Sequence, residues 1–282
     1  MTLTTRISAE SSANQPKSRD VDWYHPDLTW LPETSAQLFA EYSGIPKDQI
    51  LNHIHRIREK AWDVYPYPCI GVFRFIDFGA YNSPVYPSVV ERIKAGQTFL
   101  DLGCCFGQDI RKLVYDGALS ENLIGVDLHA GFHELGYELF RDRETLKARF
   151  QAQSIFDDDF LPELQGQIDI VYMGAFLHLF EPHQQKIIIR KVSKLLRDQK
   201  GSLAFGRHVG AEQAGQIGLN NKWYVYGHND STIQELFNGS GDGKWEVESQ
   251  LRPFMHEGMD QKTRPEGYEE RVRMMFFSAS RL

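Results

Sequence analysis

The sequence predicts an α/β fold built on a doubly wound, mostly parallel sheet, and three observations lead to it. From residue 98 onward, apolar runs of strand length alternate with amphipathic helical segments, an order that produces parallel strands covered by helices on both faces. The first apolar run leads through Asp101 into a glycine-bearing loop and a helical segment that begins at Ile110. The second run, 123–126, ends in another carboxylate, Asp127. Two acids at the ends of consecutive strands, with a glycine loop between them, indicate a ligand site at this edge of the sheet.

The loop after the first strand lets a ligand approach the backbone closely. Gly103 and Gly107 remove side chains there, and the following helix start offers unpaired N–H groups. Because Asp101 precedes the glycines, the order differs from the G-x-G-x-x-G loop of dinucleotide-binding folds and disfavours an NAD-dependent oxidoreductase. It resembles motif I of class I S-adenosylmethionine (SAM)-dependent methyltransferases, usually D/E-x-G-x-G-x-G, with Cys105 in place of the middle glycine. The resemblance implies SAM as the cofactor, with Asp127 accepting hydrogen bonds from its ribose diol.

Later segments extend the resemblance to a class I methyltransferase Rossmann-like, doubly wound seven-stranded sheet. Residues 149–157 stand where that pattern places the adenine contact, and 168–180 stand where the fourth strand ends beside the methionine arm and the substrate. A strand over 201–206 follows, and strands over 245–251 and 273–279 would complete the sheet, one of them antiparallel. The residues expected to bind the cofactor lie at these strand ends and in the glycine loop: Asp101 (at the methionine end), Gly103, Cys105, Gly107, Asp127, Ser154, Ile155, Phe156 and Met173.

Composition restricts the partners and the compartment. The 282 residues carry 31 basic and 38 acidic side chains, a net charge of −7 that does not favour nucleic acid. No apolar stretch approaches the roughly 20 residues of a membrane span. The polar N-terminus lacks an apolar signal core, so we expect a cytoplasmic protein. Three cysteines, two of them adjacent, make neither a disulfide framework nor a zinc site, and no metal is expected. The thiol of Cys105 is interpreted as a small hydrophobe in preference to a reactive group.

Three parts follow one another along the chain. Residues 1–20 are interpreted as a disordered tail, 21–95 as an N-terminal helical cap and substrate lid, and 96–282 as the SAM-binding methyltransferase core. Within the core, residues 207–242 are rich in glycine and aromatic residues and separate the fifth strand from the last two. We expect this segment to be either a flap over an apolar substrate or a surface insertion with its own small cluster.

The cap is expected to be mainly helical. A short helix is predicted over 35–42, and a longer one over 48–65, where apolar residues recur at steps of three or four. Asp48 follows Pro46 and is predicted to be the N-cap of the longer helix. The run Pro66-Tyr67-Pro68 is expected to end that helix.

Four blocks give a resemblance that is narrower than the fold. They are Trp23-Tyr24 with DLTWLPET at 27–34, HIHRIR at 53–58, YPYPCIGVFRF at 65–75 and DLGCCFGQD at 101–109. Together they resemble the methyltransferases of fungal meroterpenoid biosynthesis, of the austinol, andrastin and terretonin type, over nearly the whole chain from Val21. This resemblance implies a carboxyl O-methyltransferase that converts the acid of a farnesylated dimethylorsellinic-acid-type intermediate into a methyl ester.

The nucleophile decides which polar side chains are needed. A carboxyl group, with a pKa of about 4, is ionised at neutral pH and needs only positioning and exclusion of water, whereas a phenol, with a pKa of about 10, needs a general base. Three polar side chains at the ends of the fourth and fifth strands are the candidate catalytic residues: His178, Arg207 and His208. Contacts to the prenyl chain and the acid are expected from six further residues: Trp23, Tyr24, Phe73, Arg74, Trp223 and Tyr226.

Two other functions remain open at this point. One is O-methylation of a phenol or enol of another fungal secondary metabolite, in which His178 would act as the base. The other is a non-catalytic SAM-fold binding protein, which the missing middle glycine at Cys105 leaves room for. In the carboxylate interpretation the partner is a small prenylated polyketide acid, and a homodimer is left open.

Overall fold

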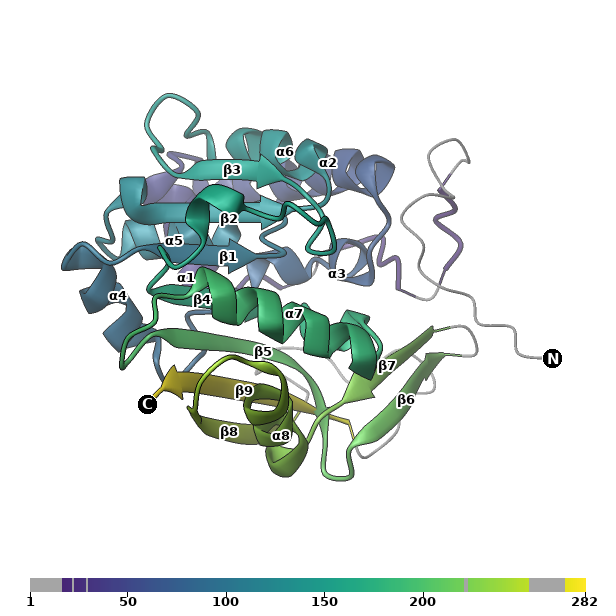
Figure 1. The fold of residues 1–282 in the computed structure, drawn as a ribbon. Helices are drawn as coiled ribbons and strands as arrows, with labels where there is room; N and C mark the ends of the chain where they lie inside the picture. Colours follow the sequence, from purple (N-terminus) through teal and green to yellow (C-terminus); the bar gives the residue numbers. More distant parts are fainter. Residues whose placement is uncertain (1–16, 22, 29, 221–222, 254–271) are drawn as a thin grey trace.

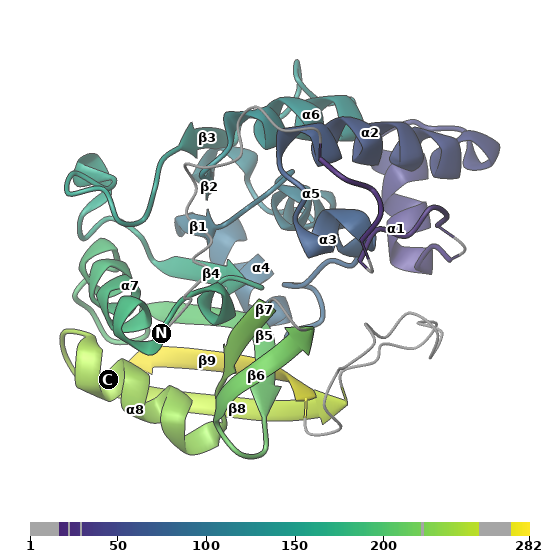
Figure 2. The ribbon, with the colours of Figure 1, turned by 90° about the vertical axis from the view of Figure 1, so that its right-hand side faces the viewer.

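A single mixed sheet with helices on both faces forms the centre of the molecule (Figures 1 and 2). The computed structural model describes residues 17–282 apart from 22, 29, 221–222 and 254–271, so most of the predicted disordered tail lies outside the described residues. Figure 2 shows α7 and α8 on one side of the sheet, with α4, α5, α6 and the N-terminal helices on the other. Within the described part of the chain, no helix is both long and apolar enough to span a membrane.

The sheet has seven strands in the order β3-β2-β1-β4-β5-β9-β8, which confirms the predicted strand number. The first five strands are parallel, and β9 pairs antiparallel with both β5 and β8. The order reverses direction between β1 and β4, and in sheets of this kind ligands bind at that point, outside the carboxyl ends of the strands. The strands are β1 Phe99–Leu102, β2 Leu123–Asp127, β3 Arg149–Ala152, β4 Ile170–Gly174, β5 Leu203–Ala211, β8 Trp245–Pro253 and β9 Val272–Arg281.

Each face of the sheet has its own apolar core, because successive side chains of a strand point to opposite faces. On β4, Met173 belongs to the core beneath α7 and α8, while Tyr172 belongs to the core beneath α4 and α5. The helices of this part are α4 Tyr86–Lys94, α5 Gln108–Tyr115, α6 Ala130–Phe140, α7 Pro182–Leu195 and α8 Asp230–Ser240, with short turns η4 Ser120–Asn122, η5 Pro162–Leu164 and η6 Leu177–Leu179.

The N-terminal part packs on α6 through a third apolar core, which includes Ile54, Ile57 and Trp62 of α2 and Phe140 of α6. The prediction that Asp48 caps this helix is wrong. Pro46 leads into a 3-10 turn, α2 starts two residues after Asp48, and its N-cap residue makes no side-chain capping bond. The elements here are α1 Glu33–Gln37, η1 Leu38–Tyr42, η2 Lys47–Gln49, α2 Ile50–Val64, α3 Pro68–Gly71 and η3 Arg74–Ile76.

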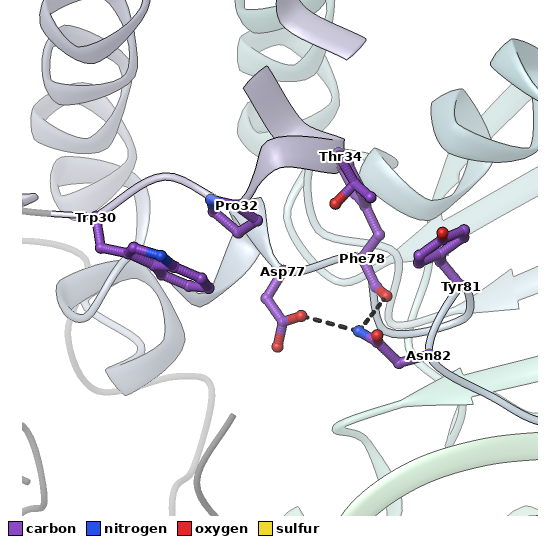
Figure 3. Close-up of a pocket in the computed structure, with 7 residues that line it drawn as sticks. All are labelled: Trp30, Pro32, Thr34, Asp77, Phe78, Tyr81 and Asn82. Atoms are coloured by element: carbon purple, nitrogen blue, oxygen red, sulfur yellow. Dashed lines mark hydrogen bonds between the residues drawn. The ribbon is translucent and has the colours of Figure 1, made fainter. Parts of the chain in front are cut away.

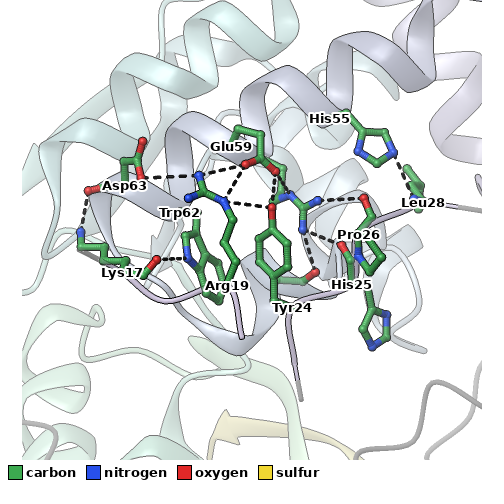
Figure 4. Close-up of polar contacts among 12 residues, drawn as sticks. Lys17, Arg19, Tyr24, His25, Pro26, Leu28, His55, Glu59, Trp62 and Asp63 are labelled. Atoms are coloured by element: carbon green, nitrogen blue, oxygen red, sulfur yellow. Dashed lines mark hydrogen bonds and ion pairs between the residues drawn. The ribbon is translucent and has the colours of Figure 1, made fainter. Parts of the chain in front are cut away.

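A buried arginine ties the chain before α1 to α2. Arg58 is 1 % exposed, and its guanidinium lies 4.2 Å from the Tyr24 ring centroid and 4.3 Å from that of Phe73. It donates to the carbonyl oxygen of His25 at 2.7 Å and pairs with Glu59 at 2.9 Å. The Tyr24 hydroxyl donates to the same Glu59 carboxylate at 2.6 Å (Figure 4). The segment around Tyr24 is therefore fixed onto α2.

The segment 207–242, expected to be either a flap or a surface insertion with its own small cluster, is built from regular elements. Strand β5 continues to Ala211, and β6 Gly215–Asn220 pairs with β7 Trp223–Gly227 as a separate two-stranded sheet. Helix α8 then begins at a capping box between Asn229 and Thr232, and its apolar side joins the core beneath α7. The β6–β7 hairpin extends beyond the end of the seven-stranded sheet (Figure 1), so the segment is part core and part projection.

Candidate functional site

The loop between β1 and α5 is held in shape by β2 and its terminal acid. The N–H of Gly103 donates to the carbonyl oxygen of Val126 at 2.8 Å, and the N–H of Cys105 donates to Asp127 Oδ2 at 2.9 Å. Gly103, Cys105 and Gly107 have φ values of +80°, +51° and +64°. Cys105 therefore adopts the left-handed conformation of the glycine that it replaces, at a cost of roughly 1–2 kcal/mol.

Two buried acceptor atoms lie beside this loop with no hydrogen-bond partner among the described residues. They are Oδ2 of Asp101, a side chain 2 % exposed, and Oε1 of Gln108 at the start of α5. Burial raises the pKa of Asp101 well above its usual value, and the nearby carboxylates of Asp109 and Asp127 raise it further. A cationic donor would satisfy both acceptors, as the methionine ammonium group of SAM would. Sequence reasoning missed Gln108, although a polar residue directly after the last loop glycine was a visible signal.

The neighbouring strand ends carry exposed apolar side chains, as an adenine ring requires. Leu128, directly after β2, is 41 % exposed, and Phe156 is 37 % exposed. Ser154 Oγ accepts the Phe156 N–H at 3.2 Å and so shapes the turn after β3. The side chains of Ile155 and Met173 lie in the core, 5 % and 0 % exposed, so only their backbone atoms can reach a ligand. The loop, the acceptors and these apolar groups together fit SAM.

Neutral histidines gather near the ends of β4 and β5. His178 lies in η6, and burial, together with the positive charge of Arg74, lowers its pKa to about 4. His208 is 1 % exposed, its ring centroid is 6.4 Å from that of His178, and burial lowers its pKa well below 6.5. Nδ1 of each ring is buried without a hydrogen-bond partner in the described chain. His228 stacks on His208 with 5.8 Å between ring centroids. The structure thus brings His178 and His208 together.

Arg207 does not join them. We expected Arg207 and His208 to follow the fifth strand, but both lie inside β5, where adjacent side chains face opposite sides of the sheet. Arg207 Nη1 forms an ion pair with Asp77 Oδ2 at 2.8 Å, and Nη2 donates to the Asp77 carbonyl oxygen at 3.1 Å. The guanidinium therefore connects β5 to the N-terminal part of the chain. Arg74 Nη1 is 3.7 Å from the same carboxylate, and its charge also acts on His178.

The predicted prenyl contacts are dispersed. Tyr24 and Phe73, expected to pack a prenyl chain, instead enclose Arg58, and Trp23 packs against the same apolar core. Tyr226 does face the histidines, with its ring centroid 4.9 Å from that of His228. Trp223 lies in β7, and its side chain is outside the described part of the structure.

A cavity of about 240 Å³ has Asp77, the ion-pair partner of Arg207, in its wall (Figure 3). Asp77 also accepts a hydrogen bond from Asn82 Nδ2, another lining residue, at 3.0 Å. Aromatic side chains make up much of the remaining wall. The lining residues are Trp30, Pro32, Thr34, Asp77, Phe78, Tyr81 and Asn82.

Comparison with known proteins gives two family matches. The model of a meroterpenoid methyltransferase N-terminal domain matches residues 23–76, and that of a methyltransferase domain matches residues 99–199. The chain is 42% identical to the O-methyltransferase atr3 of Stereocaulon alpinum over 253 residues, covering 87% of this chain and 72% of that protein. It is 48% identical to the asnovolin E/chermesin D methyltransferase nvfJ of Aspergillus novofumigatus over 184 residues, 64% of this chain and 66% of that one.

Solved structures show the same fold at low identity. The SAM complex of phosphoethanolamine N-methyltransferase 2 from Haemonchus contortus superposes with a TM-score of 0.52 and 15% identity, covering 84% of this chain and 61% of that one. A SAM-dependent methyltransferase from Methanosarcina mazei gives 0.51 at 14% identity, with 69% and 97% covered. At these identities the likeness concerns the fold alone.

Proposed function

Because the chain belongs to the meroterpenoid methyltransferase family and uses SAM as its cofactor, we propose that it methylates a carboxylate. The substrate is the acid of a farnesylated dimethylorsellinic-acid-type intermediate, and the product is its methyl ester. Relatives named O-methyltransferases support transfer to oxygen. The choice of a carboxylate over a phenol rests on the chain's own side chains.

The low pKa of His178 is the observation that carries this choice. An imidazole with a pKa of about 4 is neutral at pH 7. Proton transfer to it from a phenol with a pKa of about 10 would be uphill by about 8 kcal/mol. A carboxylate is already ionised and needs no proton acceptor. His178 therefore suits an anionic nucleophile better than one that must be deprotonated.

Arg74 supplies the complementary charge. It lies near enough to His178 for its charge to lower the pKa of that imidazole, and near enough to Asp77 for an ion pair. In the proposal Arg74 attracts the substrate carboxylate, and a ring N–H of His178 donates to one carboxylate oxygen. The other carboxylate oxygen would remain free to accept the methyl group that bound SAM supplies. Because the acid is already ionised, no residue of the chain would have to remove a proton.

The cofactor supplies an electrophilic methyl group on a sulfonium, and the chain's residues position it. Asp101 and Gln108 would accept hydrogen bonds from the ammonium group of SAM, Asp127 would accept from its ribose, and the loop of Gly103 and Gly107 would lie alongside. Residues 21–95 act as the substrate lid over the core of residues 96–282. Exclusion of water by this lid strengthens the attraction between Arg74 and the acid.

The test is turnover with methyl-labelled SAM and farnesylated dimethylorsellinic acid, followed by alkaline hydrolysis and mass spectrometry. The proposal expects a labelled product that loses its label on saponification. A base-resistant product would mean a phenol ether or a C-methyl group. If SAM binds but no label moves to this or related prenylated acids, the protein is a non-catalytic SAM-binding member of its family.

O-methylation of a phenol or enol remains the second candidate, because His178 and His208 both offer a buried ring nitrogen without a partner in the described chain. His178→Ala separates the two. Loss of kcat with unchanged substrate affinity would indicate a general base, whereas a raised KM with a smaller change in kcat agrees with carboxylate positioning.

A further inference from the structure

His129 combines an enclosed imidazole with a position next to the ribose acid. It follows β2 by two residues, and its backbone N–H donates to Asp127 Oδ1 at 3.1 Å. The other oxygen of that carboxylate receives the N–H of Cys105. Asp127 thus joins the glycine loop to the chain at His129. Each carboxylate oxygen still has room for a second donor, because an oxygen of this kind has two lone pairs.

Aromatic side chains hold the His129 ring in place. The imidazole stacks on Tyr65, with 5.0 Å between ring centroids and 21° between planes, and Phe132 meets it edge-on at 5.7 Å. Tyr67 stands 6.0 Å away and packs against Tyr65 at 4.3 Å, with the two ring planes tilted by 39°. Both tyrosines belong to the N-terminal part of the chain, directly after α2. The ring is therefore clamped between that part and the methyltransferase core.

One nitrogen of the His129 ring is buried and unpaired within the described chain. Nε2 of His129 is inaccessible to solvent and has no hydrogen-bond partner among the described residues. Its side chain also makes no capping bond to α6, although it occupies the N-cap position. A buried polar atom left without a partner costs free energy, and native structures rarely keep one without a reason. Burial lowers the pKa of His129, so the ring is neutral and can either donate or accept.

We infer that His129 is a cofactor-binding residue whose Nε2 forms a hydrogen bond with a ribose hydroxyl held by Asp127. A ribose hydroxyl can donate to one group while it accepts from another, so it can serve the carboxylate and the imidazole together. Tyr65 and Tyr67 are positioning residues, because they reach the cofactor through the ring that they clamp. The cofactor site is then shared between residues 21–95 and the core. This inference rests on the binding of the cofactor alone and does not depend on which substrate accepts the methyl group.

Binding of S-adenosylhomocysteine, measured by calorimetry, tests this without any turnover. His129→Phe keeps an aromatic ring for Tyr65 and removes the nitrogen, and we expect the Kd to rise about fivefold, the worth of one neutral hydrogen bond. His53→Phe is the matched control. His53 is also a buried histidine at the α2–α6 contact, and its Nε2 is 3.0 Å from the Leu139 carbonyl oxygen. Its loss should leave the Kd unchanged.

The 2′-deoxy and 3′-deoxy forms of the ligand identify the contact. We expect the wild-type protein to bind one of these deoxy forms with a higher Kd than S-adenosylhomocysteine. The His129→Phe substitution should not raise the Kd for that deoxy form any further, because the hydroxyl that His129 contacts is already missing. An unchanged Kd in His129→Phe, or an equal loss with all three ligands, would overturn the assignment. If circular dichroism shows that His129→Phe does not fold, His129→Leu, which also removes the ring nitrogen, must give the same coupling for the assignment to stand.

Discussion

Removing the charge of Asp77 should destabilise the protein, because Arg207 has a structural partner there. The pair is close, at 2.8 Å, and the two side chains are only 9 % and 16 % exposed. Breaking a buried ion pair by removing one partner costs about 3–5 kcal/mol. Since Asp77 keeps some contact with solvent, we take about 3 kcal/mol for Asp77→Asn or Arg207→Met. In a chain of this size that corresponds to a fall in Tm of about 6 °C.

A double-mutant cycle isolates the interaction from other effects of each substitution. Thermal or urea unfolding of the two single variants and the double variant should give a coupling of about 2 kcal/mol, with the double variant far less destabilised than the sum. Strictly additive changes would refute the structural role of Arg207. An Arg207→Met variant with wild-type Tm and a raised KM for the acid would also refute it, because that result would indicate that Arg207 contacts the substrate.

Three further predictions concern the loop and the histidines. Cys105→Ala should bind S-adenosylhomocysteine with a Kd within about twofold of wild type, as measured by calorimetry. Cys105→Val places a β-branched residue at φ +51° and should raise this Kd, and equal Kd values for the two variants would contradict the expectation. Asp127→Asn should raise the same Kd about 10- to 100-fold by removing a charged acceptor, and an unchanged Kd would contradict its role at the ribose. The folded-state pKa of His228 is about 4, below its unfolded value of 6.5, so its contribution to stability is present above pH 6.5 and is lost as the pH falls toward 4. His228→Phe should therefore gain about 2 kcal/mol relative to wild type between pH of about 7.5 and 5 in urea unfolding, while parallel stability profiles would disprove this.

The order of strands and the loop could be predicted because local chemistry determines them. An apolar run that ends in an acid and a glycine has few alternatives to a buried strand followed by a tight turn, as Asp101 and Asp127 illustrate. The 207–242 segment was harder to predict, because its many glycines obscured the β6–β7 hairpin and helix α8. The capping box of Asn229 and Thr232 could have predicted the start of α8, but the glycine content of the segment was given more weight.

The functional side chains were less predictable, because their directions depend on strand length and on distant partners. A strand that continues to Ala211 sends Arg207 and His208 to opposite faces, which no pattern near residue 207 reveals. The partner of Arg207 is Asp77, 130 residues earlier in the chain. Likewise, Tyr24 and Phe73 were recognised as aromatic, but only the fold shows that Arg58 lies between them.

The atom that receives the methyl group distinguishes a methyl ester from a phenol ether. We would incubate the protein with carbon-13 methyl-labelled SAM and farnesylated dimethylorsellinic acid, and record long-range proton–carbon correlations of the product. We expect the labelled methyl protons to correlate with the carboxyl carbon, as in a methyl ester. A correlation with a ring carbon would contradict it and would require a base at His178 or His208.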